Sequence, residues 1–505
     1  MTACTRRNFL AGAALATVAS AAPFAALASE AAEGNWDYEA DIIAVGAGGA
    51  GLSCAIEAIA QGMDVIVIES QPYVGGSSRL CNGGMSIPCT PLQEEQGIED
   101  SPELFAQDLI SMTGTDNNPE WLTLHAQLAP ELWPWLTDLG VEFKAEGLLH
   151  TQGQSVPREH HVGPASVIDI LEAKALEDGA TILTETTGKR LVQDAEGRIV
   201  GVAAEDVDGN PLLLKANKGV VLCTNGYSRN PDMMNQFIFG TGAENIMAFT
   251  GLGDKGEGHK MAMAVGADTR HMSWVSLLTG QHPDGAPGQS CSLIHGGAIM
   301  VNQEGERFVD ESLGYGNVWD KVATQTGGYC WQIWDNDIAE EYAENDSSLY
   351  SMAKLRAYDG LLIEAPTLEE LAGMIDVPAD TLAATVEKYN ADLASTGADT
   401  AFGRVHIVSQ VGEAPAIDNG PFFAWKTGNV NYGTMGGLKV NLDQQVIHLD
   451  GDPIPGLYCA GTICTYAQMG LVPGTIKGVG ASGTGFGGAV IWGRYAAQRI
   501  KELEA

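Results

Sequence analysis

The chain has 505 residues, more than one hydrophobic core usually holds, so its length predicts two or three domains. Its formal net charge of −37 excludes nucleic-acid binding, because 27 basic residues against 64 acidic ones cannot neutralise phosphates. Such acidity keeps a protein soluble and equally suits docking to a basic partner, and composition alone does not separate the two.

Residues 1–28 are predicted to be an export signal rather than part of the fold. Arg6 and Arg7 precede an uncharged, alanine-rich stretch, which is the twin-arginine pattern. Ala26-Leu27-Ala28 offers a small-residue cleavage site, and Pro23 makes the stretch a poor membrane span. We expect export of the folded protein to the periplasm or another extracytoplasmic place, with the signal either cleaved or kept as an anchor.

A nucleotide-binding unit follows the signal. Residues 41–45 form an apolar run typical of a buried strand, a helix-like stretch covers residues 52–61, and a second apolar run covers residues 64–68. The turn between the first strand and the helix fits G-x-G-x-x-G, whose glycines let the backbone approach a pyrophosphate at a helix N-terminus. Glu69 can accept hydrogen bonds from ribose hydroxyls, which disfavours NADP. This unit assigns Gly46, Gly48, Ala50, Gly51 and Glu69 to the cofactor.

Further segments of small residues favour FAD over NAD as the nucleotide. One follows Glu69 directly, and two others follow the apolar runs at residues 219–223 and 456–460. Small residues after a buried strand let backbone amides approach a large flat cofactor. The cofactor residues predicted from these segments are Ser70, Gly76, Ser77, Ser78, Gly83, Gly84, Asn225, Gly226, Gly461 and Thr462.

With these motifs the chain resembles the fumarate reductase/succinate dehydrogenase flavoprotein superfamily, together with the 3-ketosteroid dehydrogenases. Shared stretches include Gly256-Glu257-Gly258-His259, which adds Glu257 to the cofactor residues, Arg307-Phe308-Val309-Asp310-Glu311, and Thr434-Met435-Gly436-Gly437. The resemblance implies an α/β fold class, in which a Rossmann-like FAD-binding domain carries an inserted α+β capping domain and substrate lies between the two. It places the FAD-binding domain at residues 37–272 and 433–505 and the cap at residues 273–432, with a surface helix pair within residues 368–394.

The resemblance also implies that FAD is held non-covalently. Members with covalent flavin carry a histidine after the glycine pair, where this chain has Ser77-Ser78-Arg79. No metal is expected, because His259, His271, His282 and His295 match no metal-ligand spacing and the nine cysteines include no C-x-x-C pair.

The departures from the fumarate reductase pattern indicate that fumarate is not the substrate. Tyr315 stands where the resemblance places a proton-donating arginine. The positions that would clamp two carboxylates read Leu278, Gly433 and approximately Gly480, and those of a proton relay read Cys291 and Ile294. A dicarboxylate therefore has no anchor at these positions.

Tyr315 instead ends a match to the R-F-x-N-E-S-x-P-Y pattern of 3-ketosteroid dehydrogenases, with Gly314 in place of the proline. By that resemblance Tyr315 moves the proton on the carbon beside the one that exchanges hydride. A second tyrosine that holds the ketone is missing from its aligned place near Val479, so Tyr432 and Tyr466 are the candidates for that role. Backbone amides of the glycine-rich residues 478–488 are an alternative to them.

These features together predict an exported FAD-dependent enzyme that acts on a C=C bond conjugated to a carbonyl in a small apolar substrate, including steroid-like molecules. Electrons would come from an external donor such as a c-type cytochrome or a quinol-linked membrane protein. Two alternatives stay open: a ketosteroid-type dehydrogenase that runs in the desaturating direction, and an electron-transfer flavoprotein without a substrate of its own.

Overall fold

The computed structural model describes residues 35–113, 118–144, 148–150, 154–238, 246–343, 351–408, 411–464, 469–471, 478–480 and 483–505. The predicted export signal at residues 1–28 and the candidate Tyr466 lie outside these ranges. Among the described residues, no helix combines the length and the apolar character that a membrane span requires.

The first sheet holds the predicted nucleotide-binding unit. Its eight strands follow the path β18-β19-β8-β1-β2-β5, and β7 joins β6 to β8. β1 pairs in parallel with β2 and β8, and β19 extends this parallel run beyond β8. The carboxyl ends of these strands therefore meet at one edge. The strands are β1 (Tyr38–Val45), β2 (Val65–Ile68), β5 (Thr181–Leu183), β6 (Thr187–Gln193), β7 (Ile199–Glu205), β8 (Pro211–Leu222), β18 (Gln445–Ile447) and β19 (Pro453–Cys459).

Small residues let the helices of this part pack closely. A Cβ on Gly493 of α15 would lie 2.1 Å from the carbonyl oxygen of Ala50 in α2, so the two helices meet backbone to backbone there. The α2 helix begins at the predicted turn and buries almost its whole length. The helices are α2 (Gly49–Ala60), α3 (Pro91–Glu95), α4 (Pro102–Thr113), α5 (Pro119–Leu128), α6 (Leu132–Asp138), α7 (Pro164–Asp178), α8 (Pro231–Ile238), α9 (Glu257–Ala264) and α15 (Thr484–Leu503).

A second, antiparallel sheet carries its own hydrophobic core. Its order is β10-β16-β12-β11, and β13 also pairs with β16. The strands are β10 (Val275–Gln281), β11 (Ile299–Val301), β12 (Tyr329–Trp334), β13 (Leu362–Ala365) and β16 (Phe422–Thr434). The helices are α10 (Trp319–Ala323), α11 (Asn336–Glu341), α12 (Met352–Ala357), α13 (Leu368–Met374) and α14 (Ala379–Thr396). The last two are the helix pair predicted within residues 368–394.

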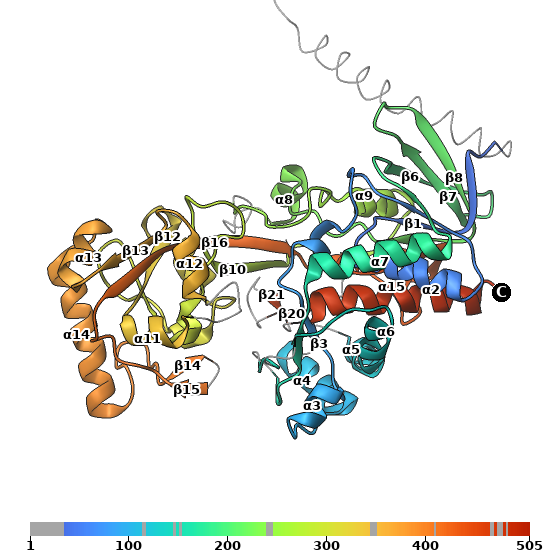
Figure 1. Cartoon of the computed structure of the whole chain (residues 1–505). Coiled ribbons are helices and arrows are strands. Elements are labelled where there is room, and N and C mark those ends of the chain that lie inside the picture. Colours follow the sequence, from blue (N-terminus) through green and yellow to red (C-terminus); the bar gives the residue numbers. More distant parts are fainter. Residues whose placement is uncertain are drawn as a thin grey trace, which may run out of the picture.

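Figure 1 shows the two sheets in separate bodies, with β10 and β16 reaching from the second toward the first. β10 begins at Val275 and β16 ends at Thr434, close to the predicted domain boundaries at residues 273 and 432, and the division itself stays a prediction. The remaining described strands form two-stranded sheets: β3 (Gly84–Ser86) with β4 (Glu159–His161), β9 (Thr269–Arg270) with β17 (Gly437–Leu438), β14 (His406–Val408) with β15 (Val411–Glu413), and β20 (Met469–Leu471) with β21 (Gly478–Gly480).

Candidate active site

A cavity of about 260 Å³ opens where the parallel strands of the first sheet end. β1, β8 and β19 are neighbours in the sheet, and each runs into a turn of small residues that lines the cavity. These turns carry Gly46, Asn225 and Gly461, which the sequence assigned to the cofactor. In open α/β sheets, the crevice outside the carboxyl ends of the strands is where nucleotides bind.

The first turn needs its glycines for close approach. Gly46 has a φ of +106°, and a Cβ there would lie 2.6 Å from the Cys223 carbonyl oxygen. A Cβ on Gly51 would lie 1.9 Å from the carbonyl oxygen of Gly46 itself. The α2 helix then begins at the cavity with neither a side-chain cap nor an acidic residue in its first turn. Such a helix N-terminus is suited to an anionic pyrophosphate.

Glu69 is held in place by backbone amides at the end of β2. Its Oε2 accepts a hydrogen bond from the Ala47 N–H at 2.9 Å, and its Oε1 accepts one from the Gln71 N–H at 2.9 Å. The carboxylate lines the cavity with remaining lone pairs. It is therefore pre-positioned to accept hydrogen bonds from ribose hydroxyls.

Two serines tie the segment after Glu69 to the other turns. Ser78 Oγ accepts a hydrogen bond from the Gly49 N–H at 3.1 Å. Ser77 Oγ accepts from Asn225 Nδ2 at 2.6 Å and from the Gly251 N–H at 2.8 Å. Segments that lie far apart in the sequence are thereby joined around one cavity.

The structure brings most of the predicted cofactor residues together. Those that line the cavity are Gly46, Gly48, Ala50, Glu69, Ser70, Gly76, Ser77, Ser78, Asn225, Glu257, Gly461 and Thr462.

Four other predicted residues lie outside the cavity lining, and each packs against protein. Gly51 abuts Gly46, and a Cβ on Gly226 would lie 2.1 Å from Thr434 Oγ1. A Cβ on Gly83 would lie 2.1 Å from the Val162 carbonyl oxygen, and one on Gly84 would lie 2.4 Å from Glu159 Oε1. Their small size serves close packing behind the cavity.

Sequence reasoning missed several residues of the cavity wall. The repeated glycines of Gly251-Leu252-Gly253 offered a signal, since glycine clusters mark close backbone approach. Gly485 and Phe486 lie in the glycine-rich residues 478–488, which the sequence singled out only as a possible holder of the substrate carbonyl. No local pattern pointed to Thr186, Thr187, Gly188, Phe249 and Ala489.

The cavity wall fits a large cofactor with hydrogen-bonding groups. Thr224 Oγ1 is buried, lines the cavity and has no hydrogen-bond partner among the described residues. A Cβ on Gly258 would lie 2.1 Å from that oxygen, so only glycine leaves room for it. Burial also raises the pKa of Asp254, another lining residue, to about 6. Buried polar atoms usually have partners, so the orphaned hydroxyl suits a ligand.

A second, small cavity of about 10 Å³ lies on the side of the second sheet. It is lined by Leu278, Thr279, Gly280, Gln281, Ser290, Ser292, Tyr315, Val430 and Tyr432. Tyr432 lines the cofactor cavity as well, and it is the residue that the two linings share. The structure thus brings two of the three candidate tyrosines to one place beside the cofactor cavity.

The backbone of Tyr315 is anchored on both sides. Its N–H donates to His295 Nε2 at 3.3 Å, and its carbonyl oxygen accepts from the Thr279 N–H of β10 at 3.0 Å. The His295 and Tyr315 rings are 4.7 Å apart, and burial lowers the pKa of His295 to about 3. The histidine is therefore neutral at physiological pH and can accept that backbone hydrogen bond.

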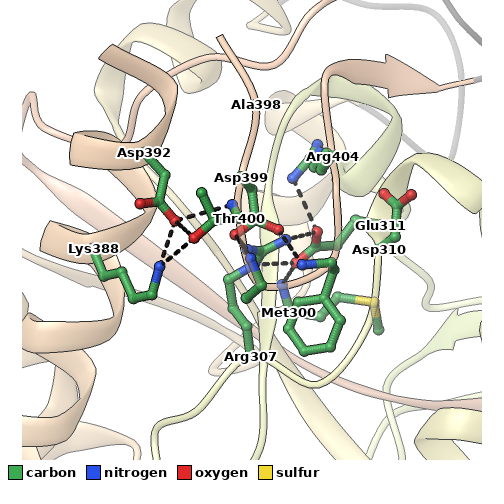
Figure 2. A network of polar contacts seen from close by, with 12 residues as sticks. Met300, Arg307, Asp310, Glu311, Lys388, Asp392, Ala398, Asp399, Thr400 and Arg404 are labelled. Carbon is green, nitrogen blue, oxygen red and sulfur yellow. Dashed lines mark hydrogen bonds and ion pairs between the residues drawn. The ribbon is translucent and has the colours of Figure 1, made fainter. Parts of the chain in front are cut away.

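A buried ionic network holds the segment that leads to Tyr315 (Figure 2). Glu311 accepts hydrogen bonds from Arg307 Nε at 2.9 Å and Nη2 at 2.6 Å, and from the Met300 N–H at 2.8 Å. Arg404 Nη1 lies 3.3 Å from the same carboxylate, and Asp399 pairs with Arg307 at 2.9 Å. Two buried carboxylates thus balance two buried guanidinium groups, which is the condition for tolerating such charges.

The described positions of the carboxylate clamp and of the proton relay carry no charge. Leu278 lines the small cavity, whereas Cys291 and Ile294 are fully buried in the core around it. Among the described residues, neither cavity is lined by an arginine, a lysine or a histidine. The described wall therefore offers no cation to a substrate carboxylate.

The described thiols and imidazoles were expected to serve the core rather than a metal. Within the described ranges no group of histidine, cysteine and acidic side chains could hold a metal ion, and every described cysteine is a free thiol. Burial lowers the pKa of His259 and of His282 to about 4, so both are neutral structural histidines. His271 stacks on Trp274 with ring centroids 3.6 Å apart.

Comparison with known proteins agrees with this geometry. The family model described as FAD binding domain matches residues 41–475. The chain is 31% identical over 434 residues to the probable fumarate reductase Ifc3 of Shewanella frigidimarina, covering 84% of this chain and 69% of that protein. It is 27% identical to the digoxin reductase of Eggerthella lenta, covering 96% of this chain and 91% of that protein.

Solved structures give the same grouping. A flavocytochrome c3 fumarate reductase in its open conformation superposes with a TM-score of 0.77 at 27% identity, covering 94% of this chain and 80% of that one. A 3-ketosteroid-Δ4-(5α)-dehydrogenase of Rhodococcus jostii RHA1 superposes with a TM-score of 0.72 at 26% identity, covering 92% and 97%. The chain therefore belongs to the FAD binding domain family, within the fumarate reductase/succinate dehydrogenase flavoprotein superfamily, and is an FAD-dependent oxidoreductase acting on CH–CH groups.

Proposed function

We propose that this protein is an exported reductase of a C=C bond conjugated to a carbonyl, in a small apolar substrate that includes steroid-like enones. Bound FAD, once reduced by the external electron donor, would supply the hydride to the carbon–carbon double bond. The observation that carries the proposal is the position of Tyr315 in a small neutral cavity that meets the cofactor cavity at Tyr432.

Tyr315 is the proposed proton donor to the carbon beside the one that receives hydride. A phenol is a weak acid that stays neutral in an apolar pocket and can still donate to a developing enolate. Its backbone hydrogen bonds with His295 and Thr279 fix the position of its Cα atom, from which the side chain extends. The Glu311 network fixes the preceding turn, so the tyrosine needs little reorganisation during the reaction.

The wall chemistry favours an enone or an apolar enoate over fumarate. Leu278 and Val430 give the small cavity an apolar side, and serine and glutamine side chains give it a neutral polar side. A substrate with two carboxylates would bind against this wall without a compensating cation, and burying an unpaired charge costs free energy. We therefore expect negligible fumarate reduction despite the likeness to fumarate reductases.

The reducing direction is favoured by the names of the relatives, among which are a probable fumarate reductase and a digoxin reductase. The structural likeness to a ketosteroid dehydrogenase favours the reverse, desaturating direction as the second candidate. Arg6 and Arg7 support twin-arginine export. An extracytoplasmic reductase needs an external electron donor, and a c-type cytochrome or a quinol-linked membrane protein suits the net charge of −37.

The test is anaerobic reoxidation of the dithionite-reduced holoenzyme, followed by flavin absorbance. Probes are 4-androstene-3,17-dione, cinnamate, a simple cyclic enone and fumarate. We expect at least one enone or enoate to reoxidise the flavin quickly and fumarate to do so negligibly. Rapid reoxidation by fumarate contradicts the inference that the neutral cavity wall disfavours a dicarboxylate. Reoxidation by none of the organic compounds favours the electron-transfer flavoprotein, and reduction of the oxidised enzyme by a saturated ketosteroid favours the desaturating direction.

A further inference from the structure

Phe249 lies at the end of the cofactor cavity that meets the small cavity. Its ring and that of Tyr432, which lines both cavities, have centroids 5.4 Å apart and an angle of 70° between their planes. Farther along the chain, a Cβ on Gly253 would lie 3.9 Å from Oε1 of Glu69, the acceptor for ribose hydroxyls. The segment between them therefore leads from the substrate side to the ADP half of FAD, and Phe249 is left beside the redox-active half.

The backbone around Phe249 is held in place by hydrogen bonds. The Phe249 N–H donates to the carbonyl oxygen of Asn431 in β16 at 2.7 Å. Arg229 Nε and Nη2 donate to the carbonyl oxygens of Thr250 and Ala248, at 2.9 Å and 3.1 Å. Because these bonds fix the peptide groups before and after Phe249, its ring is pre-positioned, and binding a ligand costs it little conformational entropy.

The ring of Phe249 is enclosed at its tip and faces the cavity with its side. Gly288 has a φ of +89°, and a Cβ there would lie 3.2 Å from Phe249 Cζ, so glycine lets its loop approach the ring tip. Tyr432 meets the ring edge to face, and such a contact covers at most one face of a ring. Phe249 is only half-buried and lines the cofactor cavity. The contact with Tyr432 therefore leaves an aromatic face for a group bound there.

The neutral wall gives a substrate few other sources of affinity. Among the described residues no arginine, lysine or histidine lines either cavity, and Leu278 and Val430 make one side of the small cavity apolar. A substrate here is held by apolar contact and single hydrogen bonds instead of ion pairs. Aromatic contacts add to the burial of apolar area, because ring faces and ring edges carry opposite partial charges. A planar ring on the substrate gains this contribution, and an aliphatic group does not.

We propose that Phe249 is a specificity residue that packs against an aryl ring conjugated to the reacting C=C bond. The proposal rests on the proposed function, because it narrows the substrate of the same site to aryl-conjugated enones and enoates. Phe249 belongs to the predicted FAD-binding part, whereas Tyr432 and Gly288 belong to the predicted cap. The aryl ring would thus lie where the two parts meet, beside Tyr315 and the redox-active half of the cofactor.

The test measures binding to the oxidised holoenzyme, without turnover, by perturbation of the flavin absorbance. Matched probes are benzylideneacetone with 4-cyclohexylbut-3-en-2-one, and cinnamate with 3-cyclohexylacrylate. The members of each pair share the conjugated carbonyl and the number of carbons, and differ in whether the ring is planar and aromatic. We expect the phenyl probe of at least one pair to bind about three- to tenfold more tightly than its cyclohexyl partner, the usual gain from an aromatic contact beyond buried area.

Two variants and a control assign this preference to one ring. Phe249→Leu keeps an apolar side chain without the ring, so it should bring the two affinities of a pair close to equality. It should also retain FAD as the wild type does, measured as flavin content after gel filtration. Gly288→Ala keeps the ring but displaces its tip, so it should weaken the preference. Phe143→Leu is the matched control, since Phe143 is also half-buried, stacks on Trp133 at 4.3 Å and lines neither cavity.

Three binding results overturn the proposal: no binding of either phenyl probe, equal affinities within both pairs in the wild type, and a preference that survives Phe249→Leu. Loss of FAD from Phe249→Leu overturns it as well, because the ring would then serve the cofactor. A reductase assay that fails with every probe while the phenyl preference holds refutes the proposed function alone. Turnover of an enone together with equal binding within the pairs refutes the role of Phe249 alone, so the two proposals fail separately.

Discussion

Replacing Tyr315 with phenylalanine separates its chemistry from its packing. The substitution removes only the hydroxyl, and the ring keeps its place against His295 and its neighbours. Both anchoring hydrogen bonds use the backbone of residue 315, at 3.3 Å to His295 and at 3.0 Å from Thr279, so they survive. We therefore expect the variant to fold, to retain FAD and to bind substrate as the wild type does.

The magnitude follows from what is lost. One hydroxyl contributes about 1 kcal/mol to stability through its hydrogen bonds, so the melting temperature should fall by only about 1 °C in a protein of 505 residues, at roughly 2.1 cal/mol/K of unfolding entropy per residue. A positioned acid accelerates proton transfer by about 10²–10⁴-fold. That range is about 3–5 kcal/mol of barrier at 1.36 kcal/mol per tenfold in rate. The rate effect should thus far exceed the effect on folding.

The assay is single-turnover oxidation of the reduced flavin by the identified substrate, in stopped flow, for wild type and Tyr315→Phe. Tyr358→Phe is the matched control, because this tyrosine packs against the core of the second sheet and lines neither cavity. A Tyr315→Phe rate within a few-fold of the wild type would remove this tyrosine from the mechanism. A slow rate together with loss of FAD or of substrate binding would mean that the hydroxyl supports the site structurally instead.

The remaining predictions concern the cofactor, the export signal and one buried acid. Acid precipitation of the holoprotein should release yellow flavin into the supernatant, and flavin that stays in the pellet contradicts non-covalent binding. Changing Arg6 and Arg7 together to lysine should leave the precursor in the cytoplasm, as fractionation and blotting would show, and undiminished export contradicts the twin-arginine assignment. In apoprotein, Asp254→Asn should raise stability at pH 8 and not at pH 3. Burial raises the folded-state pKa of Asp254 from 3.8 to about 6, so its charge costs about 3 kcal/mol above pH 6 at 1.36 kcal/mol per unit, and nothing once both states are protonated. A pH-independent difference in urea midpoints between the variant and the wild type contradicts this.

The nucleotide-binding half could be predicted from the sequence because its signals are local. The strand, the glycine turn, the helix and Glu69 lie within one short segment, and β1, α2 and β2 form there with small shifts of their ends. Even here, the pattern leaves two roles open for a single glycine. Gly51 and Gly226 are small because protein lies against them, and a sequence does not tell close packing from close approach to a ligand.

The substrate side could not be predicted in the same way, because its contacts join distant parts of the chain. Tyr315 stood out through a family pattern, not through any physical signal of its own. The small cavity is lined by residues of β10 and β16 and by Tyr315, which lie far apart in the sequence. Arg307 and Glu311 stood in one shared stretch of sequence, but only the fold brings the distant Arg404 to Glu311 and Asp399 to Arg307.

The ionic network around Glu311 has a consequence for how this architecture can diversify. All of its members, Met300, Arg307, Glu311, Asp399 and Arg404, belong to the body of the second sheet, and none lines the cofactor cavity. The turn that presents Tyr315 is thus braced without help from the nucleotide-binding body. Residues facing the substrate can then be exchanged over evolution, or grafted from a relative in the laboratory, while the flavin site stays unaltered. A chimaera that transfers this whole body should keep the tyrosine in its position. A chimaera that takes Arg307 from one parent and Arg404 from the other should leave a buried charged group without its partner.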